Sequence, residues 1–434
     1  MPLNTCAGGP NKEALALLAK INKEHPGAVC FASEMRVAER FTSGSLSLDI
    51  ALGGGWPGNQ WVEVIGRESH GKTAIVYKTV AANQKKDPNF TCLWIAAEHY
   101  DVDQATALGV DNDRVLVVPT QAMEFAYQTM LDFAASRSVD MIVLDSYPAL
   151  IADEESEKDM DEATMALGAR LTGKFFRKSG AATKRSMTDT TDRPLLGIVI
   201  NQYRDAIGKF SPHGTPTTTP GGNAKNYAFY TRVEVRRDEW IQEARPGKGK
   251  VNVGQVIKVK TIKNKSAAPQ QTATVDFYFR SAPFMNFARG DYDTVKEIMI
   301  MGILFDVIQR KGAYFQIDNG EYDDKGKPVL RWQGKDPMLA TIREDLDLQE
   351  ALYEKILVAS KKVDERSISE EDLDAAETAG KKTVTRRPKE WKPGDPLPVK
   401  PGNDRYMPGD NAAVDAHILE QMNAQANGLN TEAA

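Results

Sequence analysis

The chain has 434 residues, enough for roughly two or three domains with a substantial core. Its 41% hydrophobic and 26% charged residues are typical of a globular protein, and its formal net charge of −5 excludes a uniformly basic surface. Any surface for nucleic acid must therefore be local.

The cysteines and histidines argue against further classes. The three cysteines lie far apart and form no C-x-x-C pair, which favours a reduced compartment without a disulfide framework or zinc site. The five histidines show no ligand spacing. No run approaches the ~20 apolar residues of a membrane span, and the N-terminus lacks a signal-peptide pattern. We expect a cytoplasmic protein with no membrane partner.

Pattern and composition divide the chain into four segments. Residues 1–40 contain a helical pattern of apolar residues at 12–23. Residues 41–285 alternate strand-like and helical stretches, and residues 286–360 form a compact mixed unit. The last segment, 361–434, has too few large apolar residues to offset the entropy of ordering, so we expect a largely disordered tail.

The second segment predicts a mainly parallel sheet. Its strand-like runs cover residues 61–66, 91–97, 140–145, 195–201, 231–236, 255–262 and 272–279. The first four alternate with helical stretches, which is typical of βαβ units with right-handed crossovers, and the last three would extend the same sheet.

Residues 66–73 read Gly-Arg-Glu-Ser-His-Gly-Lys-Thr and lie between a predicted strand and a predicted helix at 74–86. This pattern and context predict a P-loop, in which glycines turn backbone N–H groups toward phosphate and the helix dipole adds to the attraction. Lys72 would reach the β- and γ-phosphates of ATP, and the Thr73 hydroxyl would bind Mg²⁺. The alternative is a plain glycine-rich turn. The predicted ATP-binding positions are Gly66, Glu68, Ser69, Gly71, Lys72, Thr73 and Asp145.

Polar residues follow three of the predicted strands. Residues at the carboxyl ends of parallel strands line the nucleotide crevice. Glu98 could orient and deprotonate an attacking water, although a solvated strand-end charge is the simpler alternative. Asp145 ends an apolar run in the Walker-B pattern and would hold Mg²⁺, through water. Gln202 follows Asn201, where an amide could sense the γ-phosphate.

The stretch 203–224 is unusual because it is long and rich in Gly, Pro and Thr. Arg204, Lys209 and the adjoining Lys225 give it a basic bias, with only Asp205 opposing. Loops of this length inside a domain are usually functional or disordered.

Together these motifs resemble the bacterial RecA recombinase family, in order and with similar spacing, over roughly residues 12–358. The likeness rests on 42–53, Glu98-His99, Asp145-Ser146, Asn201-Gln202, 217–224 and Lys263-Asn264-Lys265. It implies an α/β fold: a RecA-like P-loop ATPase core with a mainly parallel twisted sheet, an N-terminal helix, a small α+β C-terminal domain and a disordered tail. It also implies a homo-oligomeric helical filament on single-stranded DNA, with ATP between protomers, that exchanges strands with homologous duplex DNA.

Carried over to this chain, the resemblance makes Glu98 the catalytic base and Gln202 the γ-phosphate sensor, acting with Lys72. Lys263 and Lys265 would reach the neighbouring protomer's ATP and offset charge on the transferred phosphoryl group. A solvated strand end is the alternative for this lysine pair. The helix at 12–23 would pack on the adjacent subunit and serve polymerisation.

The resemblance also implies two DNA-facing loops, at 157–166 and 203–224. The DNA-binding positions would be Met165, Arg170, Arg177, Arg204, Ile207, Gly221 and Gly222. The two apolar side chains would wedge between bases, while the arginines and the Gly-Gly backbone would contact phosphates without sequence preference. Ordinary packing and a solvated helix face are the alternative interpretations.

Some positions depart from the family pattern. Arg67 and His70 replace the usual Pro and Ser of the P-loop, and the Tyr expected to stack on adenine is missing. Tyr100, Asp101 and Asp103 all remain possible base contacts. Two other functions also stay open: a filament-forming DNA-binding regulator without strand exchange, and a P-loop helicase, which would not explain the lysine pair.

Overall fold

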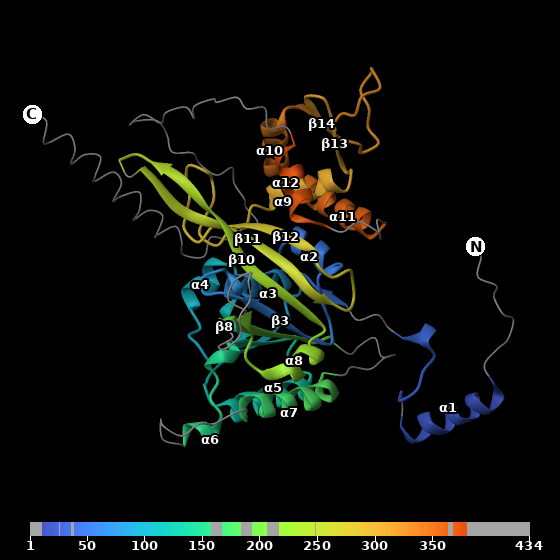
Figure 1. Ribbon diagram of the computed structural model, residues 1–434. Coiled ribbons are helices and arrows are strands. Elements are labelled where there is room, and N and C mark those ends of the chain that lie inside the picture. The colour runs from blue at the N-terminus through green and yellow to red at the C-terminus, as the bar shows by residue number, and fades with distance from the viewer. Residues whose placement is uncertain are drawn as a thin grey trace, which may run out of the picture.

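The computed structural model describes residues 11–25, 27–35, 39–157, 167–183, 193–205, 217–247, 249–362 and 368–379. Its centre is an eight-stranded sheet in the order β12-β11-β10-β3-β7-β6-β4-β5 (Figure 1). The bounds are β3 Gln60–Gly66, β4 Cys92–Ala96, β5 Val115–Pro119, β6 Met141–Asp145, β7 Leu196–Gln202, β10 Thr231–Arg245, β11 Gly249–Asn264 and β12 Thr272–Phe277. The six strands from β10 to β5 are parallel, and β11 and β12 continue antiparallel. The predicted mainly parallel α/β sheet is confirmed.

Alternating side chains of the inner strands supply two separate cores. Val62 and Val64 of β3 face one core with Trp94 of β4, whereas Trp61 and Leu93 face the other. This alternation follows from the two-residue period of a strand, and burial on both faces explains the continuous apolar runs. The sheet is therefore covered on both sides.

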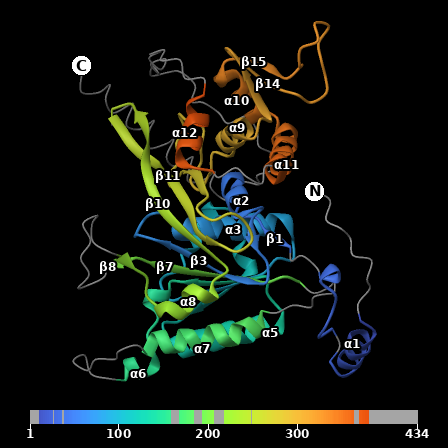
Figure 2. The same ribbon diagram turned by 45° about the vertical axis from the view of Figure 1, so that its right-hand side comes forward.

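Helices α2 (Leu46–Leu52), α3 (Lys72–Lys86) and α4 (Val102–Ala107) contribute to the first core. Helices α5 (Met123–Ser136), α7 (Leu167–Ala182) and α8 (Gly222–Ala228) lie on the other side of the sheet (Figure 2). The remaining short elements are β1 Arg40–Phe41, β2 Trp56–Pro57, α6 Asp153–Ser156, β8 Arg204–Asp205 and β9 Thr217–Thr218.

Helix α1 (Lys12–Glu24) stands apart from the core in Figure 1, and none of its residues is buried. Its cap is local, because the Asn11 side chain accepts a hydrogen bond from the backbone N–H of Glu13 at 3.0 Å. Leu15 and Leu17 remain 38% and 58% exposed, so the apolar face of the helix is uncovered in the monomer.

The C-terminal unit has its own core. It contains α9 (Thr294–Leu304), the antiparallel strands β13 (Ile308–Lys311), β14 (Tyr314–Ile317) and β15 (Arg331–Gln333), and helices α10 (Lys335–Glu344) and α11 (Leu346–Lys362). Buried apolar residues of α9 and the small sheet pack together with both helices. The predicted small α+β C-terminal domain is confirmed.

Part of the chain after residue 361 forms helix α12 (Glu370–Thr378), which the composition did not predict. Ser369 and Asp372 form a capping box at its start, and Leu373 and Ala376 are buried in the C-terminal core. The carbonyl of Ile368 accepts a hydrogen bond from Thr272 N of β12 at 3.1 Å, and the N–H of Ile368 donates to Gln271 Oε1 at 2.6 Å. Two apolar positions on one helix face were too weak a signal among so many acidic residues. The helix suggested at 412–424 lies outside the described residues.

No helix within the described ranges is long and apolar enough to cross a membrane.

Candidate nucleotide site and DNA-facing helices

The P-loop connects β3 to α3, as predicted. Gly71 precedes α3 with a φ of +94°, and a Cβ there would lie 2.5 Å from Cδ1 of Ile257. A Cβ on Gly66 would lie 2.3 Å from the carbonyl oxygen of Val235 on β10. Only glycine fits at either end of the loop, so the motif matches a tight backbone turn rather than a chance spacing.

Lys72 and Thr73, the predicted phosphate- and Mg²⁺-binding residues at the start of α3, both have partners inside the site. Lys72 Nζ donates to the carbonyl oxygen of Arg67 at 2.7 Å, so the ammonium closes over the loop. Burial lowers the pKa of Lys72, opposed by the nearby carboxylates of Asp145 and Glu98. Thr73 Oγ1 donates to Asp145 Oδ2 at 3.0 Å. The Walker-B carboxylate and the P-loop hydroxyl are thus adjacent.

The environment of Asp145 tests whether a divalent cation would fit. Burial, together with the charge of Glu98, raises the pKa of Asp145 to about 7, although Thr73 and Lys72 favour its ionised form. Because this environment disfavours the ionised carboxylate, a cation bound to its oxygens would stabilise the charged form. The Thr73 hydroxyl and Asp145 carboxylate are oxygen ligands of the kind Mg²⁺ prefers. These residues fit ATP and Mg²⁺.

The carboxyl ends of three neighbouring strands bring the other predicted residues together. Glu98 follows β4, and its backbone N–H donates to the carbonyl of Asp145 at 3.0 Å. Its Oε1 accepts hydrogen bonds from Ser146 Oγ and, at 3.2 Å, from Gln202 Nε2. The β3–β7 register places Gln202 opposite Gly66 of the P-loop. The predicted base, metal-binding carboxylate and sensor therefore lie at one edge of the sheet.

A cavity of about 360 Å³ opens beside Glu98 and could hold a base. Tyr100 and Asn112 line it, and the Tyr100 hydroxyl donates to Asn112 Oδ1 at 2.7 Å. Asp101 instead caps α4, accepting from Gln104 N at 2.9 Å, and Asp103 is exposed.

The predicted DNA-binding positions that the structure describes lie on α7, on the short β8 and at the start of α8. Arg170, Arg177 and Arg204 are all exposed, and Arg170 lies 4.0 Å from Glu154. Gly221 and Gly222 form the turn at the start of α8, with φ values of +107° and +69°. A Cβ on Gly222 would lie 3.1 Å from the Cβ of Ala169, so α7 and α8 are in contact. Met165 and Ile207 lie outside the described residues.

Lys263 and Lys265 lie beside the other end of α8. Lys263 Nζ donates to the carbonyls of Asn226 at 2.7 Å, Tyr227 at 3.2 Å and Phe229 at 2.6 Å, which caps the C-terminus of the helix. Lys265 Nζ lies 5.8 Å from the ring centre of Tyr230. In this protomer, therefore, Lys263 is bound to the helix that follows the second loop.

Sequence reasoning missed a buried charged group between these regions. Glu63, on β3, is fully buried and pairs with Lys225 of α8 at 2.7 Å and with Arg232 at 2.6 Å. One signal was available, because Glu63 interrupts the otherwise apolar run Trp-Val-Glu-Val-Ile. A charge in a fully buried strand requires a partner.

A strand–loop–helix with Lys and Thr at the helix start, at the carboxyl edge of a parallel sheet, defines a P-loop protein. The model of the RecA N-terminal domain matches residues 14–282. A protein RecA from Sulfurovum sp. (strain NBC37-1) is 33% identical over 338 residues, covering 77% of this chain and 88% of that protein. One from Petrotoga mobilis is 36% identical over 313 residues (71% and 77%), and one from Trichormus variabilis is 32% identical over 395 residues (87% and 100%). The chain belongs to the RecA family, which confirms the resemblance.

Proposed function

We propose that this protein is an ATP-dependent homologous recombinase. It forms helical filaments on single-stranded DNA and catalyses pairing and strand exchange with a homologous duplex, with DNA-dependent ATP hydrolysis. The observation that carries the proposal is that the side chains of Thr73, Asp145, Glu98 and Gln202 lie together at one edge of the sheet. Gln202 is followed directly by the second predicted DNA-facing loop, 203–224. A DNA partner agrees with the cytoplasmic location expected from the sequence.

In the proposed site, Lys72 and the P-loop backbone bind the phosphates. A bound Mg²⁺ would neutralise phosphate charge beside Thr73 and Asp145. Glu98 would take a proton from the attacking water, and its contacts with Ser146 and Gln202 support this role because they orient the carboxylate. Gln202 would release Glu98 when it turns to the γ-phosphate.

Exposed apolar residues support filament formation. The outer strand β5 presents Leu116 and Val117, 45% and 38% exposed, and Phe125 of α5 is 57% exposed. Exposed apolar side chains on and near an outer strand are typical of an interaction surface. The uncovered face of α1 would pack on such a surface of the next protomer.

The neighbouring protomer would also complete the ATP site. Lys265 is exposed, and Tyr227 at the same end of α8 is 80% exposed, so this end of the helix faces outward. We expect Lys263 and Lys265 to approach the neighbour's phosphates, as the family resemblance implies. Lys263 would then leave the α8 carbonyls, which links nucleotide binding in one protomer to the second loop of another.

Strand exchange between a circular single strand and a homologous linear duplex tests the proposal. With ATP and Mg²⁺ the full-length protein should convert the duplex into joint molecules and nicked circles. Omitting ATP, or supplying a heterologous duplex, should leave both substrates unchanged. DNA binding and ATP hydrolysis without exchange would instead favour the filament-forming regulator.

A further inference from the structure

One buried carboxylate joins the P-loop strand to the helix that begins with the Gly221–Gly222 turn. Glu63 is fully buried, and the side chain of its partner Lys225 is only 2% exposed. Such a pair loses much hydration free energy and persists only with close geometry and additional hydrogen bonds. Lys225 Nζ has these bonds, to Thr219 Oγ1 at 2.8 Å and Asn226 Oδ1 at 3.2 Å.

Asn201 connects the same carboxylate to the sensor strand. Its Nδ2 donates to Glu63 Oε1 at 2.7 Å and to the carbonyl of Pro220 at 3.2 Å, and its Oδ1 accepts from Gln202 N at 2.9 Å. One amide therefore contacts the residue that would sense the γ-phosphate, the buried carboxylate and the residue before Gly221. A displacement of the end of β7 must change at least one of these bonds.

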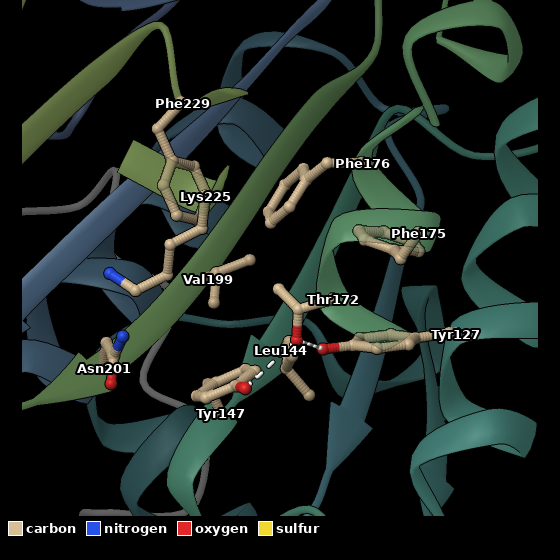
Figure 3. Close-up of a pocket in the computed structure, with 10 residues that line it drawn as sticks. All are labelled: Tyr127, Leu144, Tyr147, Thr172, Phe175, Phe176, Val199, Asn201, Lys225 and Phe229. Carbon is tan, nitrogen blue, oxygen red and sulfur yellow. Dashed lines mark hydrogen bonds between the residues drawn. The ribbon is translucent and has the colours of Figure 1, made fainter. Parts of the chain in front are cut away.

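The stem of Lys225 lies directly beneath the turn. A Cβ on Gly221 would be 2.6 Å from Cδ of Lys225 and 3.2 Å from Cζ of Tyr147. Figure 3 shows Lys225 and Asn201 on the same side of a small cavity, with Tyr147 nearby. The turn is thus in contact with the residue two positions after the Walker-B Asp145.

The small cavity leaves the side chains around it little room to move. Its volume is about 10 Å³, room for about one water molecule, and its lining includes Phe175 and Phe229. Thr172 of α7 joins Tyr127 and Tyr147, at 2.9 and 3.0 Å between oxygens (Figure 3). Tight packing passes displacement on rather than absorbing it.

We propose that Lys225 is a positioning residue that couples nucleotide binding to the DNA-facing turn. Its ion pair with Glu63 holds Gly221 and Gly222 in register with the ends of β3 and β7. A shift of Gln202 toward a γ-phosphate then moves the turn into its DNA-binding position. This inference rests on the proposed function and adds the residue through which the two sites communicate.

The test measures how much a nucleotide tightens DNA binding. Fluorescence anisotropy of a labelled oligodeoxythymidine is followed with the full-length protein, with and without ATPγS and Mg²⁺. Lys225→Met keeps the stem under Gly221 and leaves Glu63 paired with Arg232, whereas Lys225→Arg keeps the charge. Lys296→Met is the control, because Lys296 of α9 is also paired with carboxylates, Asp276 of β12 and Glu377 of α12, away from the nucleotide site.

We expect Lys225→Met to reduce the nucleotide-dependent gain in DNA affinity about tenfold, within the ~5–150-fold range of allosteric couplings. Nucleotide affinity without DNA should stay within about twofold of wild type, and Lys225→Arg and Lys296→Met should keep the gain. The inference would be overturned if Lys225→Met kept the full nucleotide-dependent gain in DNA affinity, or if Lys296→Met lost as much of that gain. Loss of nucleotide binding by Lys225→Met would also overturn it.

A second variant covers the case in which Lys225→Met does not fold. Thr219→Val removes one acceptor of the Lys225 ammonium but keeps the side-chain shape, and should give a smaller loss of the gain. An unchanged gain in that variant would also refute the coupling. A wild-type protein without any nucleotide-dependent DNA binding would contradict the proposed function instead.

Discussion

Gln202 Nε2 donates a hydrogen bond to Glu98 Oε1 across 3.2 Å, and the hydroxyl of Ser146 donates to the same oxygen. The sheet order β7-β6-β4 explains this contact, because it places the ends of three strands side by side although 104 positions separate Gln202 from Glu98. The residue proposed to sense the γ-phosphate therefore also orients the residue proposed to activate water. In the proposed mechanism, γ-phosphate sensing and ATP hydrolysis therefore depend on the same hydrogen bond.

Glu98→Gln should retain ATP and single-stranded DNA binding but lose turnover. General-base catalysis contributes ~10²–10⁴-fold, so DNA-dependent phosphate release should fall at least about 100-fold. The measurement pairs phosphate release with binding of a fluorescent nucleotide. Glu350→Gln, an exposed position on α11, is the control and should hydrolyse normally. Normal hydrolysis by Glu98→Gln would remove this residue as the base.

Lys72→Ala should abolish ATP-dependent filament growth, because the ammonium that would bind the β- and γ-phosphates is lost. Electron microscopy with ATP, Mg²⁺ and single-stranded DNA provides the readout. Lys85→Ala, at the other end of α3, should form normal filaments. Unchanged filaments in the Lys72 variant would count against the P-loop assignment.

Gly71→Ala tests whether close contact, and not only backbone conformation, requires glycine in the P-loop. A non-glycine residue in the left-handed region costs ~1–3 kcal/mol. The new methyl group would also lie 2.5 Å from Ile257 Cδ1, and overpacking adds ~1–3 kcal/mol. Gly247 also has a positive φ, +70°, and among the described residues no atom would lie within 4 Å of a Cβ there, so Gly247→Ala isolates the backbone contribution. Denaturant unfolding should show a larger loss for Gly71→Ala; equal losses would contradict the contact.

Glu297 should make the stability depend on pH. It is buried between α9 and the start of α2, where it accepts from Ser45 Oγ at 2.9 Å and Ser47 N at 3.2 Å, and burial raises its pKa to about 8. In the unfolded chain Glu297 ionises near its ordinary pKa of 4.5. The stabilisation that the protonated side chain gives the folded state is therefore complete below that pH and is lost as the pH rises through about 8.

Glu297→Gln removes this titration and should flatten the pH profile. Urea midpoints at pH 5 and pH 8.5 should differ less in the variant than in wild type. The buried Asp49 and Asp145, whose pKa values are also raised, will leave part of the slope in both proteins. An identical slope would show that Glu297 does not titrate in this window.

Deletion of residues 361–434 should destabilise the C-terminal unit, whereas deletion of 380–434 should not. Only the longer deletion removes the buried Ile368 and Leu373, each worth ~1.5–3 kcal/mol of burial. It also removes Glu370, which pairs with Arg236 at 2.6 Å. Thermal unfolding of both truncated proteins provides the comparison; equal midpoints would mean that α12 contributes nothing to stability.

The sequence by itself determined the P-loop and the residues at the strand ends. Gly66, Gly71, Lys72 and Thr73 belong to one loop of eight consecutive residues, so their spacing is informative without any tertiary contact. Glu98 and Asp145 follow apolar runs whose parallel pairing brings their ends to one edge. Local geometry and strand direction were sufficient for these predictions.

Only the tertiary structure decided which charged groups are buried together. Glu63 and Lys225 lie 162 positions apart, and no periodicity connects a strand residue with a lysine beyond an irregular loop. The sequence likewise contained no signal for the hydrogen bonds from Lys263 to the carbonyls of α8, or for the packing of α12 against the rest of the protein. Burial raises the free energy of an unpaired charge enough to require a partner, but the identity of that partner depends on how distant elements pack.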